Sequence, residues 1–139
     1  AGVEAPAPAA APGAAAAMRP LSILLVEDDP GIATLVAQLL EAMGHGVRHL
    51  QGAKAALAAL EEGIRPDIVV TDVLMPGGMS GLELAARLRE GWPGLPVVLT
   101  TGYADRLEDI AATGLPVLRK PFAADELDAA IRAVMRETA

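Results

Sequence analysis

The sequence predicts a doubly wound α/β domain, in which a five-stranded parallel sheet is covered on both faces by five helices. Short apolar runs alternate with helical patterns from Pro20 to the end of the chain, as in proteins built from strand–helix–strand units. The runs are continuously apolar, which is typical of strands buried on both faces. At 139 residues, 53% of them hydrophobic, the chain supports one such core and hardly two.

The first half of the chain contains the patterns of two strands and two helices. Residues 23–26 predict the first strand, and the apolar positions that follow recur at helical spacing. We expect this helix to bury one face, made of Ile32, Leu35, Val36, Leu39, Leu40 and Met43. It ends at Gly44-His45-Gly46, and a weak second strand over 47–50 leads to an Ala-rich helix over 54–62.

The second half repeats the alternation. Strands are predicted at 68–70, 97–99 and 117–118. Helices are predicted at 82–91, at about 105–112 with a poorer pattern, and from residue 123 to near the end of the chain. The last helix has acidic residues in its first turn and arginines towards its end, which is the order that the helix dipole favours. We expect it to bury Leu127, Ile131 and Val134.

Residues 1–20 differ from the rest of the chain because they are dominated by Ala and Pro. They lack the basic start and Leu-rich centre of a signal peptide, and Pro6, Pro8 and Pro12 would interrupt any helix. We therefore expect residues 1–20 to be a flexible, semi-extended linker and residues 21–137 to be the folded domain. Such a linker suggests a preceding segment, with a cloning remnant as the alternative.

Composition and charge exclude several functions. The net charge is −7, and the 11 Lys and Arg residues form no basic cluster, so we expect no direct binding of nucleic acid. No stretch approaches the roughly 18 uninterrupted apolar residues of a membrane span, so we expect no membrane insertion by this segment. The absence of cysteine excludes disulfides and fits a cytoplasmic location, which is also compatible with a parent protein anchored in a membrane.

Three adjacent carboxylates follow the first strand, at Glu27, Asp28 and Asp29. Like charges at such short range cost on the order of a few kcal/mol, so either water on an exposed loop or a bound cation must offset them. In a sheet of order 2-1-3-4-5 the first and third strands are neighbours, which brings Asp28 next to Asp72. We therefore predict a Mg²⁺ site there, with Asp29 turned away to start the following helix beside Pro30.

The remaining polar residues at strand ends suggest phosphoryl chemistry. Asp72 follows the third strand, Thr101 the fourth and Lys120 the fifth. A carboxylate beside Mg²⁺ can attack a phosphoryl group and become an acyl phosphate. The Thr101 hydroxyl and the Lys120 ammonium would then stabilise charge on the transferred oxygens. Each residue alone has a plainer explanation as a helix cap, a strand residue or a solvated charge, but their conjunction at successive strand ends favours the chemistry.

The stretches VEDDP, VVTDVLMPGGMSGLEL, VVLTTGY and VLRKPF, in this order, resemble the receiver domain of bacterial two-component response regulators over about residues 21–137. The resemblance implies a flavodoxin-like fold with strand order 2-1-3-4-5. It also implies that the domain promotes transfer of a phosphoryl group from a phosphohistidine to Asp72. Thr101 and Lys120 would contact that group, and Lys120-Pro121 would be a cis peptide.

The resemblance further implies the ligands of the metal and the class of partner. Mg²⁺ would be held by Asp28, Asp72 and the backbone carbonyl of Leu74, with Glu27 acting largely through water. The partner would be a histidine kinase or a histidine phosphotransfer protein. A homodimer through the fourth helix, fifth strand and fifth helix is also compatible with the family. Val117 stands where the family usually has Phe or Tyr, which leaves the readout of activation open.

Details of the motifs favour one context within this family. The loop 77–81 is one residue longer than in the commonest receivers, and together with TTGY and LRKPF it is similar to receivers fused behind histidine kinases. We therefore expect the C-terminal receiver of a hybrid histidine kinase, which itself would be an enzyme, with a free-standing single-domain response regulator as the alternative. A Mg²⁺-dependent phosphatase on a similar sheet is the alternative from another class. That chemistry requires two aspartates separated by one residue, where this chain has Glu27-Asp28-Asp29-Pro30.

Overall fold

The computed structural model describes residues 19–75, 78–102 and 107–138. They contain a five-stranded parallel sheet in the order β2-β1-β3-β4-β5, which confirms the predicted fold class. The strands are β1 (Ser22–Val26), β2 (Gly46–Leu50), β3 (Ile68–Asp72), β4 (Val97–Thr101) and β5 (Val117–Arg119). The linker predicted at 1–20 lies almost wholly outside the described residues, and it stays a prediction, as does the boundary at 137.

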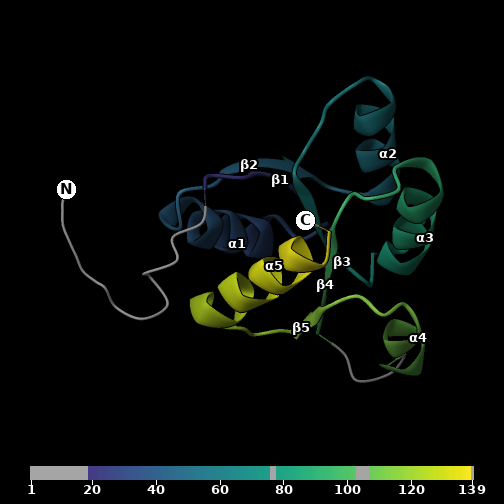
Figure 1. The fold of residues 1–139 in the computed structure, drawn as a ribbon. Helices are drawn as coiled ribbons and strands as arrows, with labels where there is room; N and C mark the ends of the chain where they lie inside the picture. The colour runs from purple at the N-terminus through teal and green to yellow at the C-terminus, as the bar shows by residue number, and fades with distance from the viewer. Residues whose placement is uncertain (1–18, 76–77, 103–106, 139) are drawn as a thin grey trace.

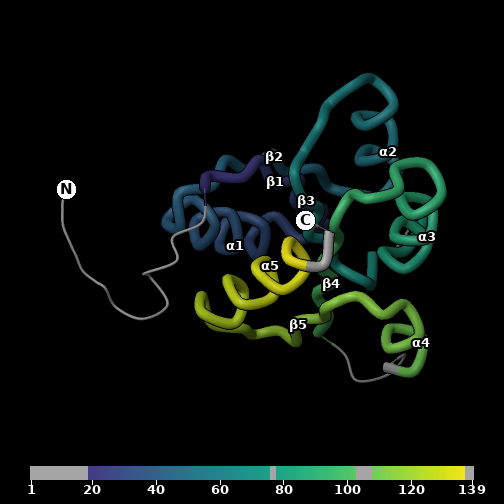
Figure 2. Tube along the Cα trace, in the orientation of Figure 1, coloured from purple at the N-terminus to yellow at the C-terminus, as the bar shows by residue number. Residues whose placement is uncertain are grey.

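Helices cover both faces of the sheet, as Figure 1 shows. They are α1 (Pro30–Ala42), α2 (Ala53–Glu61), α3 (Gly81–Gly91), α4 (Leu107–Ala112) and α5 (Ala124–Thr138). α1 and α5 lie side by side on one face, which the Cα trace in Figure 2 also shows, and α2, α3 and α4 lie on the other. No helix in the described ranges is both long and apolar enough to cross a membrane. The start of the helix predicted at about 105–112 falls on residues 105–106, outside the described part.

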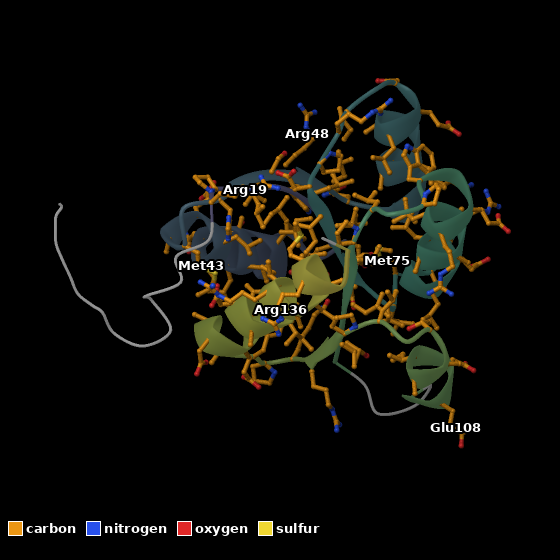
Figure 3. The ribbon with its side chains drawn as sticks, in the orientation of Figure 1. Arg19, Met43, Arg48, Met75, Glu108 and Arg136 are labelled. Carbon is orange, nitrogen blue, oxygen red and sulfur yellow. The ribbon has the colours of Figure 1, made fainter. Side chains whose placement is uncertain are left out.

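Two hydrophobic clusters, one on each face of the sheet, form the core. α1 and α5 pack against one face through residues that include Val36, Leu40, Leu127 and Ile131. The cluster on the other face contains residues of α2 and α3, with Ile110 from α4. In Figure 3, Met75 lies inside the molecule, whereas Arg48 and Glu108 point outwards. The predicted burial of Leu127, Ile131 and Val134 is confirmed.

The central strands carry their polar residues at their carboxyl ends. β3 and β4 are buried along their whole length, and each extends two residues beyond the apolar run that predicted it. Asp72 is therefore the last residue of β3 and pairs with Thr100 of β4, and Thr101 pairs with Arg119 of β5. Because these residues are paired within the sheet, main-chain hydrogen bonds fix the positions of their Cα atoms.

α1 begins as predicted, but it buries a different face. The Asp29 carboxylate accepts hydrogen bonds from the N–H groups of Gly31 at 2.8 Å and Ile32 at 3.1 Å, which makes it the N-cap. The expected burial of Leu35 is wrong, because its side chain is 59% exposed. The small Ala33 lies against the sheet with Val36 and Leu40, and this contact turns the Leu35 side of the wide apolar stripe outwards.

His45, in the turn between α1 and β2, is a buried histidine. Its side chain is 5% exposed, and Nδ1 accepts a hydrogen bond of 3.0 Å from the Leu21 N–H. Nδ1 therefore carries no proton. Burial lowers the pKa of His45, and the charge of Asp128, which raises it, is opposed by that of Arg132. His45 is therefore neutral in the folded state at pH 7.

A neutral buried histidine makes stability depend on pH. Because the folded pKa of His45 lies below its unfolded value of about 6.5, its contribution is present above that value and is lost as the pH falls through the folded pKa. We expect the free energy of unfolding to fall on acidification below about pH 6.5, with a His45 contribution of at most about 1.4 kcal/mol per pH unit. Urea denaturation of the unmodified domain and His45→Gln from pH 7.5 to 5 measures this difference. Parallel curves would contradict the prediction.

Candidate functional site

An acidic cluster lies where β1 and β3 end side by side. Glu27 and Asp28 directly follow β1, Asp72 ends β3, and the two strands pair in parallel. One carboxylate oxygen from each of the three residues lies within 4.8 Å of the others. Glu27 and Asp72 are buried and Asp28 is half-buried. The strand order thus brings Asp28 and Asp72 together as predicted.

Lys120 inserts its ammonium group into this cluster from the end of β5. Its Nζ lies 2.8 Å from Glu27 Oε1 and 3.2 Å from Asp72 Oδ2. The main chain holds it there, because the Lys120 N–H donates a 2.8 Å hydrogen bond to the carbonyl of Thr101. The Lys120-Pro121 peptide is cis, as the family resemblance implied.

In the shorter ion pair, burial shifts the pKa of each partner in one direction, and the interaction with the other partner shifts it in the opposite direction. Burial raises the pKa of Glu27, and the hydrogen bond from Lys120, which lowers it, does not offset this effect. Burial also lowers the pKa of Lys120, but the hydrogen bond to Glu27 and the negative charge of Asp72 raise it above its ordinary value. Lys120 therefore stays charged at neutral pH, whereas burial makes the ionisation of Glu27 less favourable than in water.

The charges of the cluster do not balance. With the carboxylates ionised, three negative charges face one lysine, which leaves an excess of two. The three donors are all carboxylate oxygens, which are the ligands that Mg²⁺ prefers, and they lie close enough together to reach one ion. The residues present therefore fit a small divalent cation.

The Asp28 carboxylate differs from the other two carboxylates of the cluster in its contacts. Among the residues that the structure describes, no hydrogen bond or ion pair to its carboxylate is found. Asp29, by contrast, is occupied in capping α1. Leu74, whose carbonyl is a predicted ligand, follows Asp72 by two residues and borders the same cavity. Its N–H donates a long 3.4 Å hydrogen bond to Asp72 Oδ1.

Thr101 takes a different position from the other predicted site residues. It ends β4, and its side chain is buried. The cavity beside Asp72 is lined instead by the next residue, Gly102, with Lys120 and Pro121. The sheet thus places the Thr101 main chain beside Lys120, whereas its predicted contact with a phosphoryl group stays a prediction.

The acidic cluster opens into a cavity of about 670 Å³ with an apolar wall. The wall is formed by α1 and the segment after the cis peptide, through Ile32, Leu35, Val36, Leu39 and Phe122. The prediction of a wholly buried helix face missed this surface. No signal in the sequence distinguishes this surface, because apolar residues at the spacing of Leu35, Val36 and Leu39 are equally typical of a face that packs wholly on a sheet.

Gly81 lets α3 approach the main chain of Asp72. The Gly81 N–H donates a 2.8 Å hydrogen bond to the Val73 carbonyl. A Cβ at this position would overlap the carbonyl oxygen of Asp72 and would lie 2.9 Å from the Cα of Val73. Both obstacles are main-chain atoms, which cannot give way as a flexible side chain can. The glycine is therefore required for the present position of Asp72.

The fold and the site together define a receiver domain of two-component signalling. The response regulator receiver domain family matches residues 23–132, so the chain belongs to this family.

Relatives and solved structures agree with this assignment. The probable transcriptional regulatory protein TcrX of Mycobacterium tuberculosis is 37% identical over 123 residues, which are 86% of this chain and 52% of TcrX. This chain therefore spans about half the length of that relative. The structure of the response regulator TrrA of Thermotoga maritima in complex with Mg²⁺-BeF has a TM-score of 0.73 at 29% identity, over 81% of this chain and 97% of TrrA. The signal receiver domain of an HD domain-containing protein of Pseudomonas fluorescens has a TM-score of 0.76 at 29% identity, over 86% and 98%.

We expect Gly81→Ala to displace α3 from Asp72. The added methyl group has to move main chain, and such overpacking typically costs about 1–3 kcal/mol. Urea denaturation should show that loss. Gly91→Ala, at the other end of α3, is the matched control because a Cβ there would meet no neighbouring element within 4 Å. Equal stability of Gly81→Ala and the unmodified domain would contradict the close approach.

Proposed function

We propose that this domain accepts a phosphoryl group from a phosphohistidine onto the Asp72 carboxylate. The observation that carries the proposal is the position of that carboxylate, beside Glu27, Asp28 and the Lys120 ammonium at the wall of an open cavity. In the transfer, an Asp72 oxygen forms the new P–O bond while the P–N bond of the donor breaks. The donor imidazole leaves with the electron pair of that bond and takes up a proton.

The residues around Asp72 have distinct tasks in this reaction. Lys120, charged at neutral pH, pairs with Asp72 before transfer and with the phosphoryl oxygens afterwards. Glu27 fixes the Lys120 ammonium through its 2.8 Å contact. Asp28 and Asp72, with the Leu74 carbonyl and with Glu27 through water, would hold Mg²⁺. When bound, the ion would supply positive charge that offsets the negative charge of the phosphoryl oxygens.

The apolar wall supports a protein as the phosphoryl donor. Leu35 is exposed beside Ile32, Leu39 and Phe122, on the side of the cavity that adjoins the acidic cluster. Such a strip suits the apolar face of a partner helix. A histidine kinase or a histidine phosphotransfer protein that carries its histidine on a helix would present the phosphorylated ring at Asp72 while its helix packs on α1.

Other activities on this sheet have less support. A phosphatase of the predicted alternative type needs a second free carboxylate close to the first, whereas the Asp29 carboxylate is occupied in capping α1. A domain used only for docking has no need of the ion pair between buried Glu27 and half-buried Lys120, because the desolvation of charges is costly.

The protein around this domain is a separate question. The hybrid histidine kinase stays our proposal, and it is supported by the motif details of residues 77–81, 100–103 and 118–122. The relatives TcrX and TcrA bear the names of transcriptional regulatory proteins, and this chain spans about half of each. The gene sequence upstream of Ala1 and downstream of Ala139 decides between a kinase, a transcriptional regulator and a free-standing receiver.

Incubation with acetyl phosphate and Mg²⁺ tests the phosphoacceptor. We expect an increase in intact mass by one phosphoryl group, labile to base, which maps to Asp72 and is absent in Asp72→Asn. Asp29→Asn is the matched control, since asparagine also caps helices and phosphorylation should persist. Turnover of phosphomonoesters without a stable adduct would instead indicate a phosphatase, and the absence of both would indicate a docking domain.

The apolar wall predicts a second, separable effect. Leu35→Ser removes an exposed leucine whose burial by a partner is worth about 1.5–2 kcal/mol, so phosphotransfer at limiting donor protein should slow by roughly 10–30-fold. Labelling by acetyl phosphate should not change, because the acidic cluster is intact. Glu41→Gln, at an exposed position of α1 outside the cavity, serves as the control. An equal loss with both donors would refute the docking role.

A further inference from the structure

His49 lies beside the acidic cluster but belongs to neither the predicted ligands nor the predicted catalytic residues. It is on the edge strand β2, paired with Leu25 of β1, and its side chain is half-buried. Its Nε2 atom lies 2.8 Å from the carbonyl oxygen of Glu27. Because a carbonyl oxygen only accepts hydrogen bonds, Nε2 carries the proton and is the donor.

The next residue of β2 holds the other polar group of the Glu27 main chain. The Glu27 N–H donates a 3.1 Å hydrogen bond to the carbonyl of Leu50. Two successive residues of the edge strand thus fix Glu27 from both sides, one through its N–H and one through its carbonyl. The contact from His49 acts on the peptide group that joins Glu27 to Asp28. It therefore sets the direction in which the main chain continues to Asp28.

This orientation matters because the Asp28 side chain has little else to hold it. The Glu27 carboxylate is fixed by Lys120 Nζ at 2.8 Å and by the Asp29 N–H at 3.2 Å. Within the described ranges, the Asp28 carboxylate has no such partner. Its position therefore depends on the main chain, which His49 fixes before Asp28 and the Asp29 cap fixes after it.

We infer that His49 is a positioning residue of the Mg²⁺ site, which holds the Glu27–Asp28 peptide so that the Asp28 carboxylate faces Asp72. The inference rests on the proposed function, since it concerns the same site. The contact needs only the Nε2–H group, which both the neutral and the cationic ring provide. The role is therefore one of hydrogen bonding and does not require titration of the ring.

Removal of the donor should weaken Mg²⁺ binding without destroying the phosphoacceptor. We expect His49→Phe and His49→Ala to raise the Kd for Mg²⁺, measured by titration calorimetry with MgCl₂, by about tenfold, as for other residues that orient ligands. At saturating Mg²⁺ the rate of labelling by acetyl phosphate should return to within about twofold of the unmodified domain. His49→Gln, whose amide can donate to the same carbonyl, should keep the Kd within about threefold.

Controls separate this role from general stability and from the proposed function. Arg48→Ala, at the exposed neighbouring position of β2, should leave the Kd unchanged, and urea denaturation identifies which of the two donor-less variants are folded at the temperature of the titration. Equal Kd values for the unmodified domain and a folded donor-less variant would overturn the inference, as would a Kd for His49→Gln as high as that for His49→Ala. Failure of the unmodified domain to bind Mg²⁺ would instead overturn the proposed function, and the inference with it.

Discussion

The ion pairs of Lys120 with Glu27 and Asp72 are the interaction on which the site depends. Like charges about 4 Å apart repel by roughly 4 kcal/mol at an effective dielectric constant of 20, and the sheet forces three carboxylates into this range. Lys120 relieves part of that repulsion from the end of a strand that is not adjacent to β1 or β3 in the sheet. The negative charge that Lys120 leaves unbalanced is of the kind that a bound divalent cation would offset.

The rest of the domain is well packed, and this packing offsets the repulsion between the carboxylates. β3 and β4 are buried throughout, and apolar clusters fill both faces of the sheet. The polar residues are confined to the strand ends, where water and ligands have access. Gly81 then allows α3 to reach the Asp72 main chain. Hydrophobic packing on both faces thus stabilises the fold, and the residues at the carboxyl ends of the strands form the candidate site.

The elements that were predicted correctly are those with a local signal. The continuous apolar runs gave the strands, Asp29 beside Pro30 gave the start of α1, and the parallel order then placed Asp28 beside Asp72. The exposure of Leu35, the His49 contact and the approach of Gly81 to Asp72 could not be predicted in this way. Each depends on how residues from different elements meet, and neither a histidine within a weak edge strand nor one glycine among many in the sequence identifies its partner.

The site has two walls that differ in origin, and this difference has a consequence for specificity. Its acidic wall comes from the ends of β1, β3 and β5, where a change disturbs the charge balance around Lys120. Its apolar wall comes from the flank of α1, where Leu35 is exposed and makes no contribution to the buried core. Under the proposed function, a substitution of Leu35 would alter the docking of a partner without altering the acidic cluster around Asp72. The carboxylate proposed to accept the phosphoryl group and the leucine proposed to contact the donor line the same cavity, but only the carboxylate takes part in the ion pairs of Lys120.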